Sequence, residues 1–385
     1  MTKSSRTILI VVAFLFICGF LLPPGNPSGT AFPSKDFLHM KGTVVTHIVE
    51  NSTDTLSENR ILELQDDDGM TLWFGRYFYK DICVTGICRM VKLWIFWDCA
   101  GNYLGIQLDE KDPLTKSDHT PFEPEDYIRL DQILADTLSI LKSLRYEDLV
   151  TDEITQPELD DNRNLMALFE VDGYSSATSP TLKEYVVKDA VYTCYTLWHT
   201  VYGETRAHID DILESRIDAA YVKQLLMKES ENHKIFALDI IRRENSFLSE
   251  CDFMVLPLVG SLDRNISEKA LLAITPQYLS SPEKQLQFVN LMDHALPEIK
   301  YEIIYKMQLV DKVSTAAVAL LLDKFMSGKI SSGGLNQIFK IISKQELLNK
   351  GIVNNREIES RLTQLSNHPD AYTANLTRNF MKSIR

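Results

Sequence analysis

Residues 90–108 read MVKLWIFWDCAGNYLGIQL and decide the fold of the first half of this chain. Two runs rich in β-branched and aromatic residues, MVKLWIFW and YLGIQL, flank the bend DCAGN, which contains Gly101. Gly and Asn adopt the backbone angles of tight turns, so this pattern predicts a β-hairpin. Similar runs at residues 42–49 (GTVVTHIV) and 71–79 (TLWFGRYFY) extend the expected sheet toward the N-terminus.

The chain is acidic, with 40 Lys+Arg against 53 Asp+Glu and a formal net charge of −13 at pH 7. Because nucleic-acid binding relies on clustered Lys and Arg, this balance argues against a nucleic-acid partner. Carboxylates gather in residues 109–131 and 146–161. We interpret the first stretch as a loop that leads into a helix at about residues 124–144, and the second as a solvated connector. The acidic turn DDDG at residues 66–69 lacks the spacing of an EF-hand calcium loop. We therefore expect a solvated turn there and no metal site.

Past Gly203 the alternation stops and the apolar residues follow a helical spacing. Three similar segments, residues 235–241 (IFALDII), 268–274 (EKALLAI) and 301–307 (YEIIYKM), recur at about 33 residues, and a weaker copy covers 335–342. An apolar helix precedes each copy by about a dozen residues. Paired helices at this period predict an α-solenoid that resembles HEAT-type repeats, and the alternative is a helical domain with a coincidental period.

The N-terminus has the features of an export signal. Lys3 and Arg6 precede an apolar run over residues 7–22, which Pro23 and Pro24 end. This order predicts a signal peptide over residues 1–31, with an uncleaved membrane anchor as the alternative. Either reading places the rest of the chain outside the cytoplasm, in the periplasm or on the outer face of the cytoplasmic membrane.

The cysteines are too few for a disulfide scaffold and lack the CxxC pairs of a zinc site. In an oxidising compartment, Cys83 and Cys88 would either close a small disulfide or remain reduced thiols. Cleavage of the signal would remove Cys18 and leave an odd number of cysteines. We expect the free thiol to be Cys194 or Cys251, on buried helix faces.

Residues 171–181 (VDGYSSATSPT) have the composition of an anion-binding loop before a helix. Pro180 suits the first helical position and Ser179 the N-cap, so we expect a long amphipathic helix to begin there. Its buried stripe would comprise Val187, Ala190, Val191, Cys194, Leu197, Trp198 and Val201.

The small residues Ser175, Ser176 and Ala177 would let a ligand approach the backbone, and Thr178 adds a hydroxyl. Asp172 would hold the loop by accepting its N–H groups. Because unpaired N–H groups and the helix dipole favour anions, this loop is a candidate phosphate site. The alternative is an ordinary capped loop.

The sequence Asp-x-x-Ser-Ser-Ala-Thr is similar to the Asp-x-x-(Ser/Thr)-Gly-Ala-Thr motif of exported FMN-binding domains. Those domains occur in Rnf-type and sodium-pumping NADH:quinone reductases and in a regulator of nitrous-oxide respiration. The resemblance covers residues 85–202 and implies that a flavin transferase esterifies the phosphate of FMN to Thr178. It also implies that Asp172, Ser175 and Ala177 are recognition residues. Ser176 stands where the family has Gly, which would strain the loop if that position needs a positive φ.

The expected fold is therefore an α+β FMN-binding-like domain (residues 32–202) followed by an all-α, HEAT-like solenoid (residues 203–385). The resemblance implies an extracytoplasmic flavoprotein that carries FMN covalently on Thr178 and passes electrons to an unidentified redox partner. It would be an electron carrier more than a stand-alone enzyme, and no catalytic residue is assigned. The alternative is an exported helical-repeat interaction protein with a flavin-free FMN-binding-like domain, and the N-terminus would associate either form with a membrane.

Overall fold

The computed structural model describes residues 30–33, 36–50, 52–82, 90–108, 111–117, 119–146, 149, 185–349 and 351–384. The chain divides into two compact units. The first comprises Met1–Leu64, Trp73–Trp97 and Tyr103–Arg206, and the second comprises Gln65–Leu72, Asp98–Asn102 and Ala207–Arg385. Two short turns from the first half of the sequence thus belong to the second unit, whereas the sequence-based boundary at residue 203 assigned both to the first domain.

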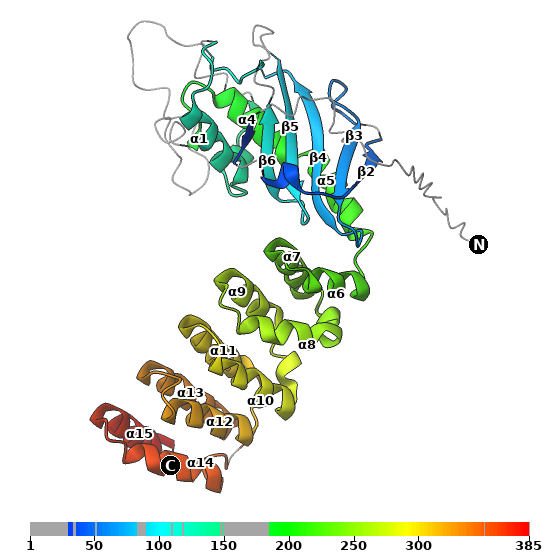
Figure 1. Ribbon diagram of the computed structural model, residues 1–385. Coiled ribbons are helices and arrows are strands. Elements are labelled where there is room, and N and C mark those ends of the chain that lie inside the picture. Colours follow the sequence, from blue (N-terminus) through cyan, green and yellow to red (C-terminus); the bar gives the residue numbers. More distant parts are fainter. Residues whose placement is uncertain are drawn as a thin grey trace, which may run out of the picture. The chain divides into compact units, whose positions relative to one another are not determined.

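The first unit is built on a six-stranded antiparallel sheet with the order β1-β6-β5-β4-β3-β2 among the described residues. Its strands are β1 (Thr30–Phe32), β2 (Thr43–Ile48), β3 (Arg60–Gln65), β4 (Thr71–Lys80), β5 (Val91–Asp98) and β6 (Tyr103–Leu108) (Figure 1). The predicted hairpin is confirmed as β5 and β6, which pair with Leu93 opposite Leu108. Gly101 bends the connection with a φ of 74°, a conformation that glycine adopts without strain.

Helices α1 (Pro124–Ala135) and α4 (Val191–Val201) contact each other, and α1 also contacts β6. Trp97 on β5 is completely buried, and its indole N–H donates to the carbonyl of Val201 at the end of α4 (3.0 Å). This bond ties the most buried strand to α4, because a buried indole N–H needs an acceptor.

The prediction of a long helix from Pro180 onward is wrong over the residues that the structure describes. The helix that carries the buried stripe begins at Val191, and Asp189 has a left-handed φ of 59° that interrupts any helix through it. Val187 and Ala190, which the pattern placed on the stripe, are buried before the helix begins. The N–H of Val187 donates to the sulfur of Cys194 (3.3 Å), so this segment packs against α4 without joining it.

The rest of the described chain is all-helical, which confirms the expected order of an α+β region followed by an α region. Its helices are α5 (Glu204–Glu214), α6 (Ala219–Met227), α7 (Glu231–Arg243), α8 (Leu248–Val259), α9 (Arg264–Ala273), α10 (Pro282–Asn290), α11 (Pro297–Leu309), α12 (Thr315–Met326), α13 (Ser332–Asn349), α14 (Arg356–Ser366) and α15 (Ala371–Ile384). The three recurring segments of the sequence lie in α7, α9 and α11, and each of these helices contacts the next.

The turn between β3 and β4 belongs to this helical unit. Met70 is 1 % exposed and is part of the helical core, and His233 on α7 bonds through Nε2 to the carbonyl of Thr71 (2.7 Å).

Lys228 forms ion pairs with Asp66 (2.7 Å) and Asp68 (2.5 Å). Burial alone would raise the pKa of Asp66, but the bonds from Lys228 and the Met70 N–H lower it. The expectation of a solvated turn is therefore wrong for Asp66, whose carboxylate is held by Lys228.

Burial of His233 makes the helical unit sensitive to acid. Burial lowers the pKa of this imidazole below its usual value of 6.5, despite the bond to Thr71. The unfolded chain therefore binds a proton near pH 6 that the folded chain does not, so stability is lost as the pH falls below about 6.5.

We expect His233→Gln to reduce this acid sensitivity, because an amide donates to Thr71 without titrating. The measurement is the urea midpoint by far-ultraviolet circular dichroism between pH 7.5 and 5. His294→Gln, at an exposed histidine, is the matched control. Identical pH profiles for wild type and His233→Gln would contradict the expectation.

Candidate functional site

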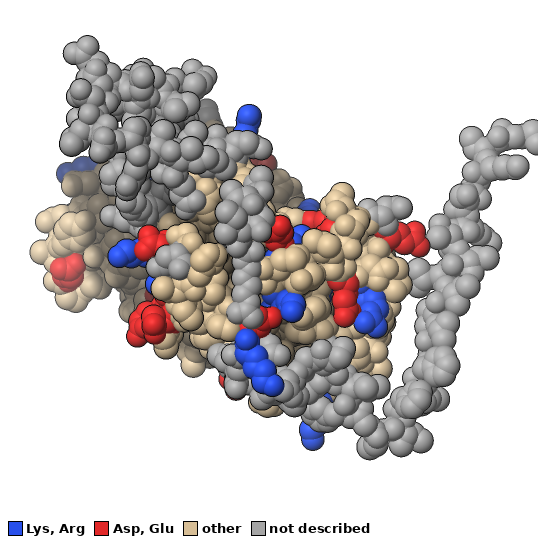
Figure 2. Space-filling model, turned by 90° about the horizontal axis from the view of Figure 1, so that it is seen from above, with Lys and Arg blue, Asp and Glu red and all other residues tan. Residues whose placement is uncertain are grey.

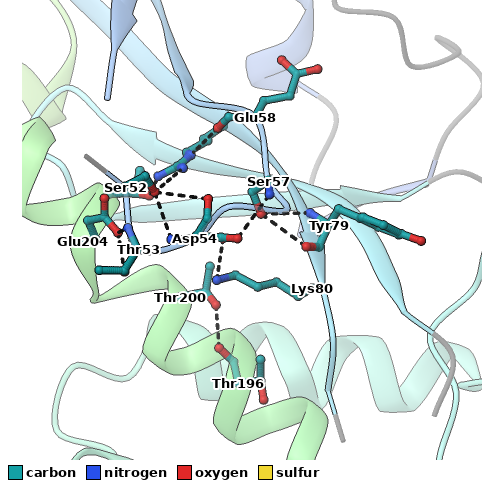
Figure 3. Close-up of polar contacts among 12 residues, drawn as sticks. Ser52, Thr53, Asp54, Ser57, Glu58, Tyr79, Lys80, Thr196, Thr200 and Glu204 are labelled. Carbon is teal, nitrogen blue, oxygen red and sulfur yellow. Dashed lines mark hydrogen bonds and ion pairs between the residues drawn. The ribbon is translucent and has the colours of Figure 1, made fainter. Parts of the chain in front are cut away.

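The residues predicted to hold FMN, Asp172, Ser175, Ser176, Ala177 and Thr178, lie outside the described residues, as do Cys83, Cys88 and most of the N-terminal segment. The described chain instead brings polar and charged side chains together around a pocket of about 280 Å³ in the first unit. These side chains come from the loop after β2, from β4, from α4 and from the first residues of α5 (Figure 3). The pocket is lined by Thr53, Asp54, Arg76, Phe78, Lys80, Tyr195, Thr196, His199, Thr200, Glu204 and Thr205.

Arg76 on β4 is the central group of this site, with only 1 % of its surface exposed. Its guanidinium donates to the carbonyl of Glu58 (2.8 Å), the hydroxyl of Thr205 (2.8 Å) and the hydroxyl of Ser52 (3.2 Å). Burial lowers the pKa of Arg76, while the charges of Asp54 and Glu204 act to raise it. A guanidinium stays protonated in proteins, so these partners hold a permanent buried charge.

Two carboxylates balance the cations of the pocket. Asp54 pairs with Lys80 (2.5 Å) and accepts the N–H of Ser57 (3.2 Å). Glu204 accepts both the N–H (3.1 Å) and the hydroxyl (2.9 Å) of Thr53. Partial burial would raise the pKa of each acid, but these bonds outweigh it and lower both pKa values. Both acids are therefore ionised at neutral pH and are already engaged within the protein.

The wall formed by α4 adds hydroxyls and an imidazole. Thr200 donates its hydroxyl to the carbonyl of Thr196 (2.7 Å), one turn earlier on the helix. His199 bonds through Nε2 to the carbonyl of Leu141 (3.0 Å), which makes Nε2 the donor and leaves Nδ1 as an acceptor. Around the pocket, the described contacts do not include the nucleophile–base pair that covalent catalysis requires.

The sequence held one signal of this site that the motif search missed. Arg76 interrupts the strand TLWFGRYFY, where the neighbouring residues are apolar or aromatic. An Arg in a strand buried on both faces must be paired, because an isolated buried charge is very costly. Its partners come from far along the chain, which is why a local motif search does not find them.

Among the described cysteines, Cys99, Cys194 and Cys251 are free and buried, which confirms the expectation for Cys194 and Cys251. Burial raises the pKa of Cys194 to about 12, so its thiol is protonated and unreactive at neutral pH. No group of three or more His, Cys, Asp and Glu side chains in the described ranges could hold a metal ion.

A second surface feature lies on the helical unit. Tyr301, Tyr305 and Leu309 follow one another at helical spacing on α11 and are 41 %, 55 % and 47 % exposed. Tyr301 also lines a pocket of about 220 Å³, together with Pro297, Lys300, Ile304, Gly328, Lys329, Ile330 and Ser331. We call these residues together the α11 surface. It combines exposed apolar side chains with the ammonium groups of Lys300 and Lys329.

On the face shown in Figure 2, the described Lys and Arg side chains alternate with Asp and Glu in small groups. Such a face lacks the single-sign field that attracts nucleic acid. Within the described residues, no helix combines the length and the apolar character needed to cross a membrane.

No family model, curated protein or solved structure matches this chain.

Removing the charge of Arg76 should destabilise the first unit. We expect Arg76→Met to cost about 3–5 kcal/mol, because it leaves buried acceptors and carboxylates without their cation. Arg76→Lys, which keeps the charge but loses the fork, should cost less. The first unit contains all four tryptophans of the chain, so the urea midpoint by tryptophan fluorescence reports on this unit.

Arg60→Met is the matched control. Arg60 pairs with Glu58 at the surface (2.7 Å) and is 48 % exposed, so its loss should cost less than about 1 kcal/mol. Equal midpoints for Arg76→Met and Arg60→Met would contradict the structural role of Arg76.

Proposed function

We propose that this chain is a helical-repeat interaction protein, in which the region after residue 207 is a HEAT-like α-solenoid that docks a protein partner. The contacts of alternate helices support this reading, since α7, α9, α11, α13 and α15 each contact the next. On the other side of the stack, α6 contacts α8, α10 contacts α12, and α12 contacts α14. Contacts restricted to neighbouring repeats are the defining property of solenoids.

Repeated polar ties between successive pairs also support the proposal. Lys306 on α11 donates to the carbonyls of Leu271 and Ile274 at the end of α9. Lys344 on α13 donates in the same way to the carbonyls of Gln308 (2.8 Å) and Val310 (3.0 Å) at the end of α11. The last carbonyls of a helix lack partners within it. Lys306 therefore satisfies the end of α9, and Lys344 satisfies the end of α11.

The α11 surface carries the docking proposal. Aromatic side chains beside a pocket are typical centres of protein interfaces, where Tyr is enriched and Lys lies at the rim. The wall of Ile304 and Ile330 fits an apolar side chain, and Lys300 and Lys329 fit carboxylates beside it. The partner is therefore a protein segment with an apolar side chain flanked by Asp or Glu.

We expect a photo-crosslinking amino acid at position 305 to capture one partner as a discrete adduct in the native host. The same amino acid at position 253 should not, although Phe253 on α8 is 68 % exposed. The readout is the mobility and mass of the adduct.

The double variant Lys300→Glu, Lys329→Glu should abolish the adduct, while Lys340→Glu at an exposed site on α13 should leave it unchanged. Equal adducts at positions 305 and 253, or adducts indifferent to both charge reversals, would refute the docking surface.

A second candidate function is favoured by the motif at residues 172–178 together with the preceding hairpin β5–β6. In this proposal the exported chain carries FMN on Thr178, a flavin transferase attaches it, and the flavin passes electrons to a redox partner. FMN would supply the redox chemistry and the protein its tether. The N-terminal segment would direct export or hold the chain at the outer face of the cytoplasmic membrane.

For this candidate, we expect wild type purified from a host with the transferase to exceed its sequence mass by one FMN and to be yellow. Thr178→Ala should lose both properties and Ser179→Ala should keep them. If the Ser176 side chain strains the loop, Ser176→Gly should raise the flavin content. An intact mass that is the same for Thr178→Ala and wild type, apart from the substitution, would eliminate this candidate.

A further inference from the structure

We propose that the pocket beside Arg76 binds a small organic monocarboxylate. The proposal is independent of the docking surface and of the flavin motif, because it rests only on contacts within the first unit.

Arg76 and Lys80 have more N–H groups than their contacts within the protein use. Arg76 has five N–H groups, of which the described contacts use three. Lys80 has three, and its ammonium forms one ion pair, with Asp54 (2.5 Å). The two acids of the pocket already accept bonds from protein groups. Glu204 accepts from Thr53, and Asp54 accepts from Ser57 and pairs with Lys80. Arg76 and Lys80, which line the pocket, therefore keep N–H groups that the described contacts do not use.

The guanidinium of Arg76 has the planar geometry that matches a carboxylate. A guanidinium presents its N–H groups in a planar fork that matches the two oxygens of a carboxylate. Three protein bonds hold the fork of Arg76 in place, and its carbon lies 5.2 Å from the centre of the Phe78 ring. A fork held this way is already ordered, so a ligand does not lose binding energy in arranging it.

The charges of the lining side chains bear on the charge of the ligand. Arg76 and Lys80 balance Asp54 and Glu204, so the formal charges of these four lining side chains sum to zero. A carboxylate adds one negative charge to that sum, whereas a phosphate dianion adds two to a partly buried site. The balance therefore favours a monoanion.

The volume and the lining of the pocket limit the ligand to a small molecule. The volume of about 280 Å³ is just below the roughly 300–1,000 Å³ of typical small-molecule pockets, so the ligand must be small. Phe78 and Tyr195 supply aromatic surface, and Thr196 on α4 lines the same space. The rest of the lining is polar, so a small acid fits it with its carboxylate at the donors of Arg76 and Lys80 and its body against Phe78 and Tyr195.

The test is isothermal titration calorimetry of the full chain with three probes: sodium benzoate, the neutral isostere benzamide, and inorganic phosphate. We expect benzoate to bind at a probe concentration of about 10 mM or below, with benzamide and phosphate at least about tenfold weaker. Absence of benzoate binding at that concentration overturns the proposal. Benzamide binding as tightly as benzoate, or phosphate binding more tightly, overturns the assignment to carboxylates.

Two variants locate the site without removing Arg76. Thr196→Phe fills the pocket and should abolish benzoate binding, while Thr363→Phe, at an exposed position on α14, should not. Lys80→Met removes a donor and should weaken binding at least about tenfold, while Lys92→Met, at a lysine 47 % exposed on β5, should not. The fluorescence urea midpoint of each variant shows whether the first unit is still folded. Benzoate binding that is unchanged in a folded Thr196→Phe overturns the proposal.

Discussion

A guanidinium buried inside a β-sheet domain needs partners, and much of the first unit is arranged to provide them for Arg76. Leaving a buried cation unpaired would cost several kcal/mol. The chain meets this requirement with the carbonyl of Glu58, the hydroxyl of Ser52 and the hydroxyl of Thr205. One side chain on β4 thus holds the loop after β2 and the start of α5, segments more than 120 residues apart in sequence. Asp54 and Glu204, whose charges act on Arg76, line the pocket beside it.

A comparable constraint operates in the helical unit, where the ends of helices leave carbonyls without donors. Lys306 on α11 supplies donors to the end of α9, and Lys344 on α13 supplies them to the end of α11. Their ammonium groups thus meet the negative ends of the helix dipoles. Burial lowers the pKa of Lys306 to about 8, below its usual value of 10.5. The register of successive helices is therefore held by directional bonds as well as by apolar packing.

The regular elements were predictable because their signals are local. The hairpin over residues 90–108 follows from strand composition and a Gly at the bend, and the helical half follows from apolar spacing. The start of α4 was not predictable, because the stripe pattern continues through Val187 and Ala190. The backbone leaves the helix at Asp189, and the N–H of Val187 bonds instead to Cys194. The docking of the acidic turn on Lys228 was missed for the same reason, since that bond joins residues 160 apart.

The sequence by itself determined the order of the elements, an antiparallel sheet before a run of helices, because hydrophobic period and turn residues act over a few positions. It also determined that Cys194 and Cys251 would be buried, since both lie on apolar helix faces. Only the tertiary structure decided that the DDDG turn joins the helical unit through Met70 and Thr71. It alone decided that Arg76, Lys80, Asp54 and Glu204 surround one pocket. The reason is physical: buried charges and carbonyls must find partners, and folding supplies those partners from distant segments.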